Sequence, residues 1–160
     1  MSKGRLTRAS DKFQQLAQAE RQARRKIIKA GYADLLVNGF NVVPYENEEL
    51  RIMGEQVGKW AGQYQRNSLE NDPNGLTIYI AVDEHPGPYE MLTTLLHEAG
   101  HALWELLDKE AIVEWQHVCA DDTSAYDAEE TFADDFMWLC LDQKRLMSHE
   151  TDFIALTAVA

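Results

Sequence analysis

Cysteine and proline are scarce in this 160-residue chain, which has two of the former, Cys119 and Cys140, and four of the latter. Two cysteines form neither a disulfide framework nor an all-cysteine zinc site, so the sequence predicts a protein of a reducing, cytoplasmic compartment. No run of about 18 apolar residues occurs, so we expect no membrane-spanning helix. The first ten residues carry basic side chains with no apolar segment behind them, and we expect no secretory signal.

The rest of the composition is that of a soluble globular protein, with 45% hydrophobic and 26% charged residues. A chain of this length can bury a substantial core without disulfides. No repeat, low-complexity stretch or linker interrupts the sequence. We therefore expect one domain spanning residues 1–160.

Charge is divided unevenly along the chain, whose formal net charge is −12. Residues 1–43 contain nine Lys or Arg and three acids, so this part carries +6 and the remaining 117 residues carry −18. An acidic body of this kind repels the phosphates of nucleic acid. The basic N-terminal helical segment, about residues 5–30, can bind nucleic acid or the chain's own acidic body, or simply form a solvated helix face.

Hydrophobic periodicity predicts several helices and one clear strand. Apolar residues indicate helices over residues 8–30, 47–66, 89–107, 110–118, 128–147 and 152–160. The alternating stretch Leu76–Val82 predicts a strand. Residues 35–43 suit either a helix that ends at Gly39 or a hairpin around Asn38 and Gly39, and we expect Pro44 to end either one. The expected fold class is α+β, mostly helical with a small sheet.

The motif that carries chemistry is His97-Glu98-Ala99-Gly100-His101, within the expected helix 89–107. Residues four apart project from the same face of a helix, so the two imidazoles can share one metal ion. Neutral imidazole suits zinc. Glu98 stands beside the metal position and can take the proton of an attacking water.

Two histidines leave such a site one ligand short, because catalytic zinc usually takes three protein ligands and a water. A carboxylate on the expected helix 128–147, facing the first helix, completes the site most simply. Glu129 and Glu130 both lie there, about 100° apart around the helix, so one of them can face the metal. The other candidates for this ligand are His117, Asp108, Asp121 and Asp122.

Taken together, His97-Glu98-x-x-His101 and Glu130-x-x-Ala133-Asp134 resemble the gluzincin arrangement of zinc metallopeptidases. The segment 130–136 is similar to the Glu-x-Phe-Ala-acid-x-Phe segment of anthrax lethal factor-type peptidase domains. The short chain resembles the compact relatives called minigluzincins. The likeness covers residues 96–139 and implies a compact zincin-like domain with an active-site helix 89–107 and a glutamate helix 128–147.

The resemblance also implies roles for individual residues. His97, His101 and Glu130 bind one Zn²⁺ per chain, and Glu98 is the general base. Asp134 accepts a hydrogen bond from a ligand histidine and fixes its tautomer. Glu129 remains the competitor of Glu130 for the metal.

A peptidase of this type also needs a group that stabilises the developing oxyanion. Tyr126 is the preferred candidate, because it lies four residues before Glu130, in the connection that precedes the expected helix 128–147, where a phenol can reach the developing charge. The others are His117, His85 and Tyr89.

The sequence thus predicts a zinc-dependent endopeptidase that acts on a protein or peptide substrate. The resemblance implies that the substrate pairs with an edge strand, which we expect to be Leu76–Val82. The alternative is a catalytically silent zinc-containing binding or regulatory protein that uses its basic N-terminal helix, including toward nucleic acid. A deformylase-like enzyme would need a cysteine ligand upstream of His97, and no cysteine precedes that residue.

Overall fold

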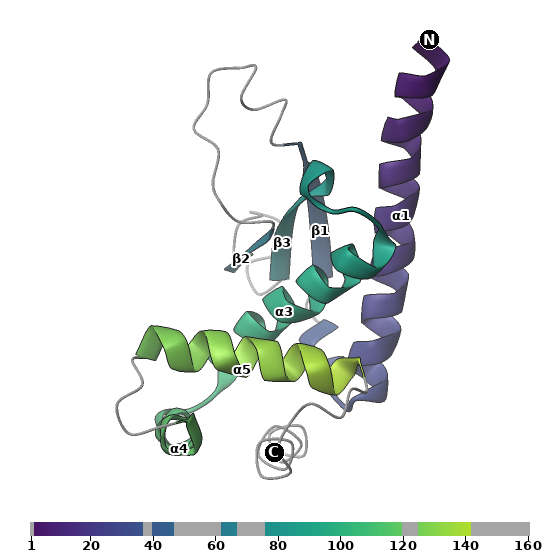
Figure 1. Cartoon of the computed structure of the whole chain (residues 1–160). Helices are drawn as coiled ribbons and strands as arrows, with labels where there is room; N and C mark the ends of the chain where they lie inside the picture. Colours follow the sequence, from purple (N-terminus) through teal and green to yellow (C-terminus); the bar gives the residue numbers. More distant parts are fainter. Residues whose placement is uncertain (1, 37–39, 47–61, 67–75, 120–124, 142–160) are drawn as a thin grey trace.

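The structure, a computed structural model, describes residues 2–36, 40–46, 62–66, 76–119 and 125–141. Its elements are α1 (Ser2–Lys29), η1 (Ala33–Leu36), β1 (Phe40–Tyr45), β2 (Gly62–Arg66), β3 (Leu76–Ala81), η2 (Val82–Glu84), α3 (Pro88–Leu106), α4 (Lys109–Cys119) and α5 (Ala125–Cys140). In Figure 1, α3 lies between the sheet and α5, while α1 runs along the side of the molecule. The expected α+β class, mostly helical with a small sheet, is confirmed.

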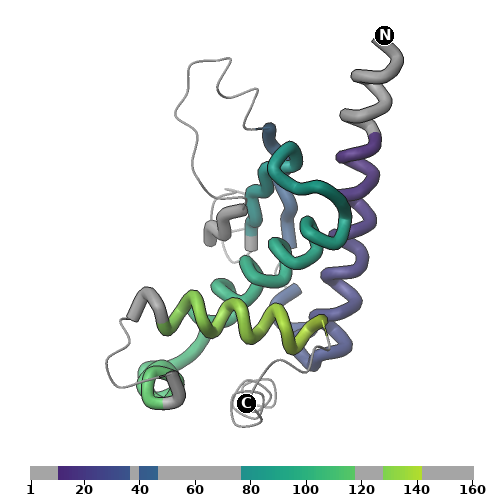
Figure 2. Tube along the Cα trace, viewed as in Figure 1, coloured from purple at the N-terminus to yellow at the C-terminus, as the bar shows by residue number. Residues whose placement is uncertain are grey.

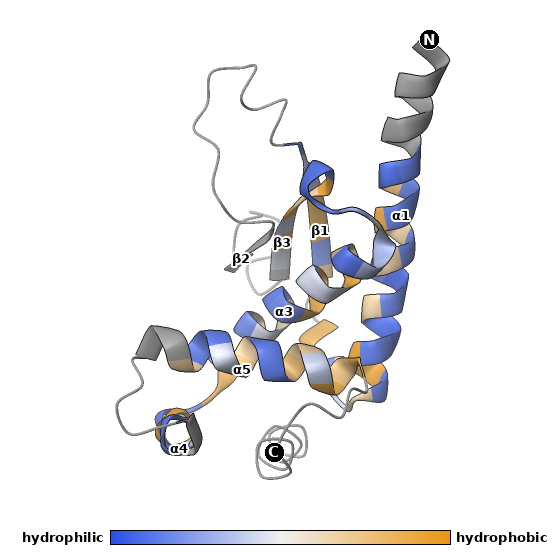
Figure 3. Cartoon of the chain, in the orientation of Figure 1, coloured by the Kyte–Doolittle hydropathy of each residue, from blue (hydrophilic) through white to orange (hydrophobic). Residues whose placement is uncertain are grey.

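Helix α1 belongs to the hydrophobic core despite its charge. Leu16, Ala19, Ala23 and Ile27 recur every three or four residues and are almost fully buried. Figure 3 shows the remainder of the described helix as largely hydrophilic. The helix begins earlier than the predicted residue 8 and ends before Gly31, whose φ of 98° lies in the left-handed region that glycine adopts without strain. The basic segment is therefore fixed to the body by its apolar stripe.

The sheet has three strands in the order β1-β3-β2. Strand β3 pairs in parallel with β1, from Phe40 opposite Leu76 to Tyr45 opposite Ala81. It pairs antiparallel with β2, from Gly62 opposite Ile80 to Arg66 opposite Leu76. The predicted strand at residues 76–82 is confirmed, but the expectation that it forms a sheet edge is wrong, since β3 is the central strand.

Two other predictions near the sheet are corrected. Pro44 does not end a preceding element but lies inside β1. Proline is compatible with this position because β1 is an edge strand of the described sheet, where alternate N–H positions face away from the neighbouring strand. Residues 62–66, predicted to end a helix, instead form β2; the rest of that predicted helix, 47–61, lies outside the described residues. Of residues 35–43, the described part forms η1 and β1 and no hairpin.

The helices predicted at 89–107 and 110–118 are confirmed as α3 and α4. That predicted at 128–147 begins earlier, as α5 at Ala125, and the described helix ends at Cys140. The predicted tail helix 152–160 lies outside the described residues. Pro88 stands at the start of α3, where its lack of an N–H costs nothing. None of the described helices has the length and apolar character needed to cross a membrane.

Helix α3 is the central element, in contact with α1, α5, β2 and β3. Its buried residues include Leu95, Leu96 and Ala99, all fully inaccessible to solvent. The chain enters α3 through His85, which is also buried. The Nδ1 of His85 donates to the Ala81 carbonyl at 2.7 Å, and its Nε2 accepts from the Thr94 hydroxyl at 2.8 Å. This imidazole therefore joins the end of β3 to the first half of α3.

The crossing of α3 over α5 is very close at Gly100. A Cβ built on Gly100 would lie 2.7 Å from the Ala133 Cα and 2.9 Å from the Ala133 carbonyl oxygen. Real Cβ atoms do not approach backbone so closely, so only glycine allows this separation of the two helices. The trace in Figure 2 shows the two helices crossing.

We predict that Gly100→Ala destabilises the protein by about 1–3 kcal/mol, because the added methyl group overpacks the crossing. Helix propensity alone would give the opposite sign, a gain of about 1 kcal/mol. Chemical denaturation measures the difference. Gly87→Ala is the control, since its Cβ would meet only the Glu90 Oε2, at 3.4 Å. A Gly100→Ala variant as stable as the wild type would contradict the prediction.

Candidate metal centre

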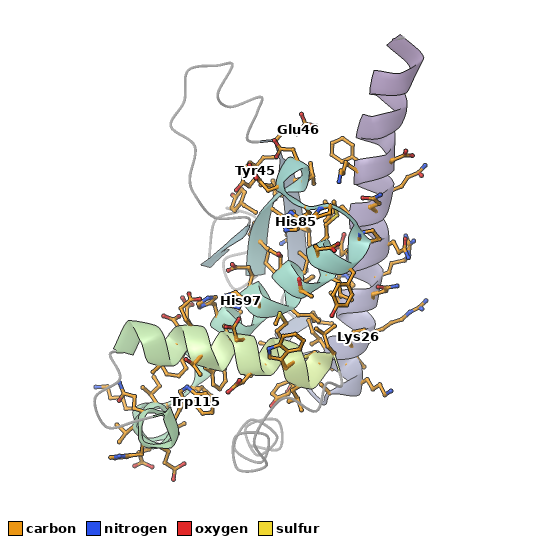
Figure 4. The ribbon with its side chains drawn as sticks, in the orientation of Figure 1. Lys26, Tyr45, Glu46, His85, His97 and Trp115 are labelled. Atoms are coloured by element: carbon orange, nitrogen blue, oxygen red, sulfur yellow. The ribbon has the colours of Figure 1, made fainter. Side chains whose placement is uncertain are left out.

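The two motif histidines project from α3 toward α5, as the helical spacing predicts. Their ring centroids are 4.8 Å apart, and the two Nε2 atoms lie 3.1 Å from each other. Both side chains are mostly but not completely buried, with 20% of His97 and 14% of His101 exposed. In Figure 4, His97 lies between α3 and α5. The pair is thus accessible from solvent at the helix crossing.

Glu130 faces both histidines from α5. Its Oε2 lies 3.2 Å from the Nε2 of His97, and its Oε1 lies 3.0 Å from the Nε2 of His101. One carboxylate therefore bridges the two imidazoles on the side where the rings approach each other. The structure brings together His97, His101 and Glu130, the three residues predicted as ligands.

The Nδ1 atom of each ring, on the side away from Glu130, faces a carboxylate of its own. The Nδ1 of His97 donates to the Asp134 Oδ1 at 2.7 Å. The Nδ1 of His101 lies 3.2 Å from the Glu129 Oε1. Protonation at Nδ1 leaves the Nε2 lone pairs turned toward Glu130. Asp134 thus occupies the orienting position that the sequence predicted, and Glu129 occupies the equivalent position on the other ring.

Aromatic packing fixes the rotation of α5 that makes these contacts. Phe132 and Phe136 are fully buried, as their four-residue spacing predicts. The Phe132 ring packs 5.3 Å from Trp104 and 5.5 Å from Trp115. The Trp115 indole donates to the Ala128 carbonyl at 2.8 Å, which joins α4 to the first half of α5. The acidic face of α5 is then left toward the histidines.

Glu98 also lies at the centre. The candidate ligand atoms of His97, Glu98 and His101 lie within 4.8 Å of one another. Tyr45 lies at the end of β1. Burial raises the pKa of its phenol most, and the negative charges of Asp83, Glu84 and Glu98 raise it further, so Glu98 is close enough to affect it. Tyr45 therefore stays protonated at neutral pH and can donate a hydrogen bond.

The charge around His97 changes its titration. Burial is the largest influence and lowers the pKa, but the Asp134 hydrogen bond and the negative charges of Asp134, Glu98 and Glu130 together raise it. The net direction is upward from the ordinary value of 6.5. The site thus attracts positive charge.

The donor set matches a small divalent cation. Tetrahedral coordination at about 2.0–2.1 Å places neighbouring ligand atoms about 3.3 Å apart. The observed separations among the two Nε2 atoms and the Glu130 oxygens are 3.0–3.2 Å. Lone pairs that converge this closely repel unless a proton or a cation lies between them. The residues present therefore suit a metal ion bound by His97, His101 and Glu130.

Other candidate residues lie elsewhere. Asp108 accepts a hydrogen bond from the Ala111 N–H at 2.8 Å and caps α4. His117 is exposed on α4. His85 is held between Ala81 and Thr94, and Tyr89 is 53% exposed in the first turn of α3. The hydrogen bonds of Asp108 and His85 are thus made to other residues than the histidine pair.

Three candidates remain without side-chain description. Tyr126 lies in the first turn of α5, and its side chain is outside the described part. Asp121 and Asp122 lie outside the described residues altogether.

Sequence reasoning missed two contributors. The sequence indicates Glu129 only as a competing ligand, although a histidine has two ring nitrogens and can face one carboxylate with each. Tyr45 carried no signal, because its proximity to Glu98 depends on the parallel pairing of β1 with β3.

Comparisons with models of protein families, with curated proteins and with solved structures gave no match to this chain.

We predict that Asp134→Asn lowers the pKa of His97 in the metal-free protein, because the variant loses a carboxylate that raises it while burial remains. An NMR titration of the imidazole measures this pKa.

Since the folded pKa is raised, the contribution of His97 to the free energy of unfolding is fully present below pH about 6.5 and is lost as the pH rises through the folded value. Glu129→Gln, which alters the partner of His101, is the control. An unchanged His97 pKa in Asp134→Asn would refute the assignment.

Proposed function

We propose that this protein is a zinc-dependent peptidase. The single observation that carries the proposal is the convergence of the His97 and His101 Nε2 atoms on the two oxygens of Glu130. The resemblance to gluzincins implies this donor set, with Glu98 beside it as the general base. Bound zinc supplies a Lewis acid that polarises the scissile carbonyl and acidifies water.

The chain's own residues would hold the metal ion. His97 and His101 would bind it through Nε2 and Glu130 through its carboxylate, while Asp134 and Glu129 contact the rings at their Nδ1 atoms. Such outer partners fix ring orientation and increase ligand basicity. We assign Glu130 as the ligand because it contacts both Nε2 atoms.

Glu98 is the proposed general base. It follows His97 directly on α3, and its carboxylate lies within 4.8 Å of ligand atoms of both histidines. From there it takes a proton from the attacking water and transfers it to the leaving amine nitrogen. Tyr126 remains the proposed oxyanion donor, and Tyr45, a protonated phenol near Glu98, is a second candidate for this role.

The proposed substrate is an extended peptide. Strand β2 contacts α3 and lies at an edge of the sheet, where its outer side pairs with no other described strand. A peptide added there would form main-chain hydrogen bonds with β2 and lie near the helix that carries the histidines. This assignment moves the expected pairing edge from residues 76–82 to Gly62–Arg66.

We expect the purified protein to bind about one zinc per chain and Glu130→Ala to lose it, because that variant removes the third ligand. Glu129→Ala should keep the stoichiometry with an affinity about 10–100-fold lower, since it removes an orienting contact. Metal analysis by mass spectrometry and competition with a chelating dye measure both values.

Glu114→Ala, which removes an exposed carboxylate of α4, is the matched control and should match the wild type. Zinc bound with unchanged affinity by Glu130→Ala would exclude the assignment of the third ligand.

We expect Glu98→Gln to keep the fold and the zinc while the rate of peptide-bond cleavage falls by about 10²–10⁴-fold, because the amide cannot accept the proton. Cleavage of unfolded casein, followed by mass spectrometry, measures the rate, and circular dichroism checks the fold. Full activity in Glu98→Gln would end the general-base assignment. A zinc-loaded wild type that cleaves no peptide would favour the catalytically silent binding protein.

A further inference from the structure

The cations of α1 whose side chains the structure describes fall into two groups with different surroundings. In the first group, the Lys12 ammonium donates to the carbonyls of His85 and Pro86, and Arg24 pairs with Glu20 and donates to the Phe40 carbonyl. These two side chains tie α1 to neighbouring elements. The second group contains cations that make no ion pair within the described part of the chain: Arg21, Arg25, Lys26 and Lys29.

Three cations of the second group line a cavity of about 510 Å³: Arg25, Lys26 and Lys29. The other residues that line it are Gln22, Tyr89, Leu92 and Leu141. Its wall is formed by α1, by the start of α3 and by the chain just after α5. A second cavity, of about 480 Å³, shares Lys26, Lys29 and Leu141 and adds Ala30, Leu139 and Cys140. We call the two cavities together the basic groove. Each is large enough for a small organic molecule.

The charged residues that line the basic groove are all positive among the described residues. No acidic residue lines either cavity among the described residues, although the whole chain has a net charge of −12. Arg25 and Lys29, spaced four apart, are like charges on one helix face and repel each other. Lys26 and Lys29 also favour the negative end of the α1 dipole, which accounts for cations in the last turn. That effect explains neither Arg25 nor the cavity beside it.

Apolar surface lies next to the charges. Leu92 is almost fully buried, and Leu139 and Leu141 contribute at the end of α5. The Cys140 thiol is neutral, because burial raises its pKa to about 12 even though Lys26 acts in the opposite direction. A ligand in this groove would therefore meet cations on the α1 side and uncharged, mostly aliphatic groups on the α5 side.

The basic groove is separate from the histidine site. The two share no residue, and Tyr89 precedes His97 by eight positions, about 12 Å along α3. Figure 4 shows Lys26 on α1 near the end of α5, away from His97. The groove needs no metal, so its function is independent of the proposed peptidase activity.

We propose that the basic groove binds an organic anion. Its carboxylate or phosphate group lies against Arg25, Lys26 and Lys29, and its apolar part lies against Leu92 and Leu141. A guanidinium and two ammonium groups form charge-assisted hydrogen bonds with either head group. The aliphatic wall distinguishes such a ligand from an inorganic ion, and the limited volume of the cavities favours a small molecule over a polymer.

The test is isothermal titration calorimetry on the full chain at low ionic strength. The probes are sodium octanoate, phenyl phosphate, inorganic phosphate and octylamine. We expect octanoate, phenyl phosphate or both to bind, with the tighter of the two identifying the head group. Inorganic phosphate should bind at least about ten-fold more weakly than phenyl phosphate, because it buries no apolar surface. Octylamine, with the same chain as octanoate and a positive charge, should not bind.

Matched charge variants locate the site. Arg25→Gln and Lys29→Gln should each raise the Kd about ten-fold, because each removes one charge-assisted hydrogen bond. Arg21→Gln removes the same charge from an exposed position of α1 that lines neither cavity, and should leave the Kd within about two-fold. Circular dichroism verifies that all three variants fold.

Three results would overturn the proposal. The first is an absence of binding by both organic anions. The second is equal affinity for inorganic phosphate and phenyl phosphate, since the apolar wall would then contribute nothing. The third is an equal loss of affinity in Arg21→Gln and Arg25→Gln, which would indicate a diffuse attraction to the whole helix.

Discussion

The candidate metal centre depends on the close approach of α3 and α5 at Gly100 and Ala133. Any side chain at Gly100 would force the helices apart, because the missing Cβ faces backbone atoms of α5 at under 3 Å. The two histidines lie three positions before and one after this glycine, and Glu130 lies three positions before Ala133. The backbone contact therefore sets the distance between imidazoles and carboxylates. A wider crossing would leave both rings beyond the reach of Glu130.

The same crossing concentrates negative charge. Glu129, Glu130 and Asp134 surround two imidazoles, with Glu98 on the facing helix. Carboxylates this close repel one another, so the folded state is stabilised by positive charge between them. A proton on His97 supplies part of it, in the direction that its raised pKa indicates. A divalent cation supplies more, which links metal binding to the stability of the α3–α5 pair.

Features that depend on local spacing could be predicted from the sequence, and features that depend on long-range pairing could not. The shared face of His97 and His101, the inward packing of Phe132 and the strand at residues 76–81 follow from helical or alternating periodicity. Strand β2, Gly62–Arg66, is short and mostly polar, so the helical periodicity of the residues before it predicts a helix that continues through it. The parallel partner of β3 is β1, which lies more than 30 residues earlier in the sequence and contains Pro44. No local pattern in the sequence indicates this pairing. The orienting contact of Glu129 depends on the rotation of α5, which tertiary packing decides.

The uneven charge along the sequence also acquires a structural reason. A lysine or arginine beside Glu130 would pair with it and occupy the position where a metal would bind. Arg25, Lys26 and Lys29 of α1 instead lie beside the start of α3 and the end of α5, where Lys26 is near Cys140. Lys12 and Arg24 are engaged with backbone carbonyls of other elements. Helix α1 thus contributes its apolar stripe to the core, while Lys26 and Lys29 lie beside Cys140, at the end of α5 opposite to Glu129 and Glu130. This separation lets one small chain keep an acidic centre between α3 and α5 and a basic groove beside α1 without mutual neutralisation.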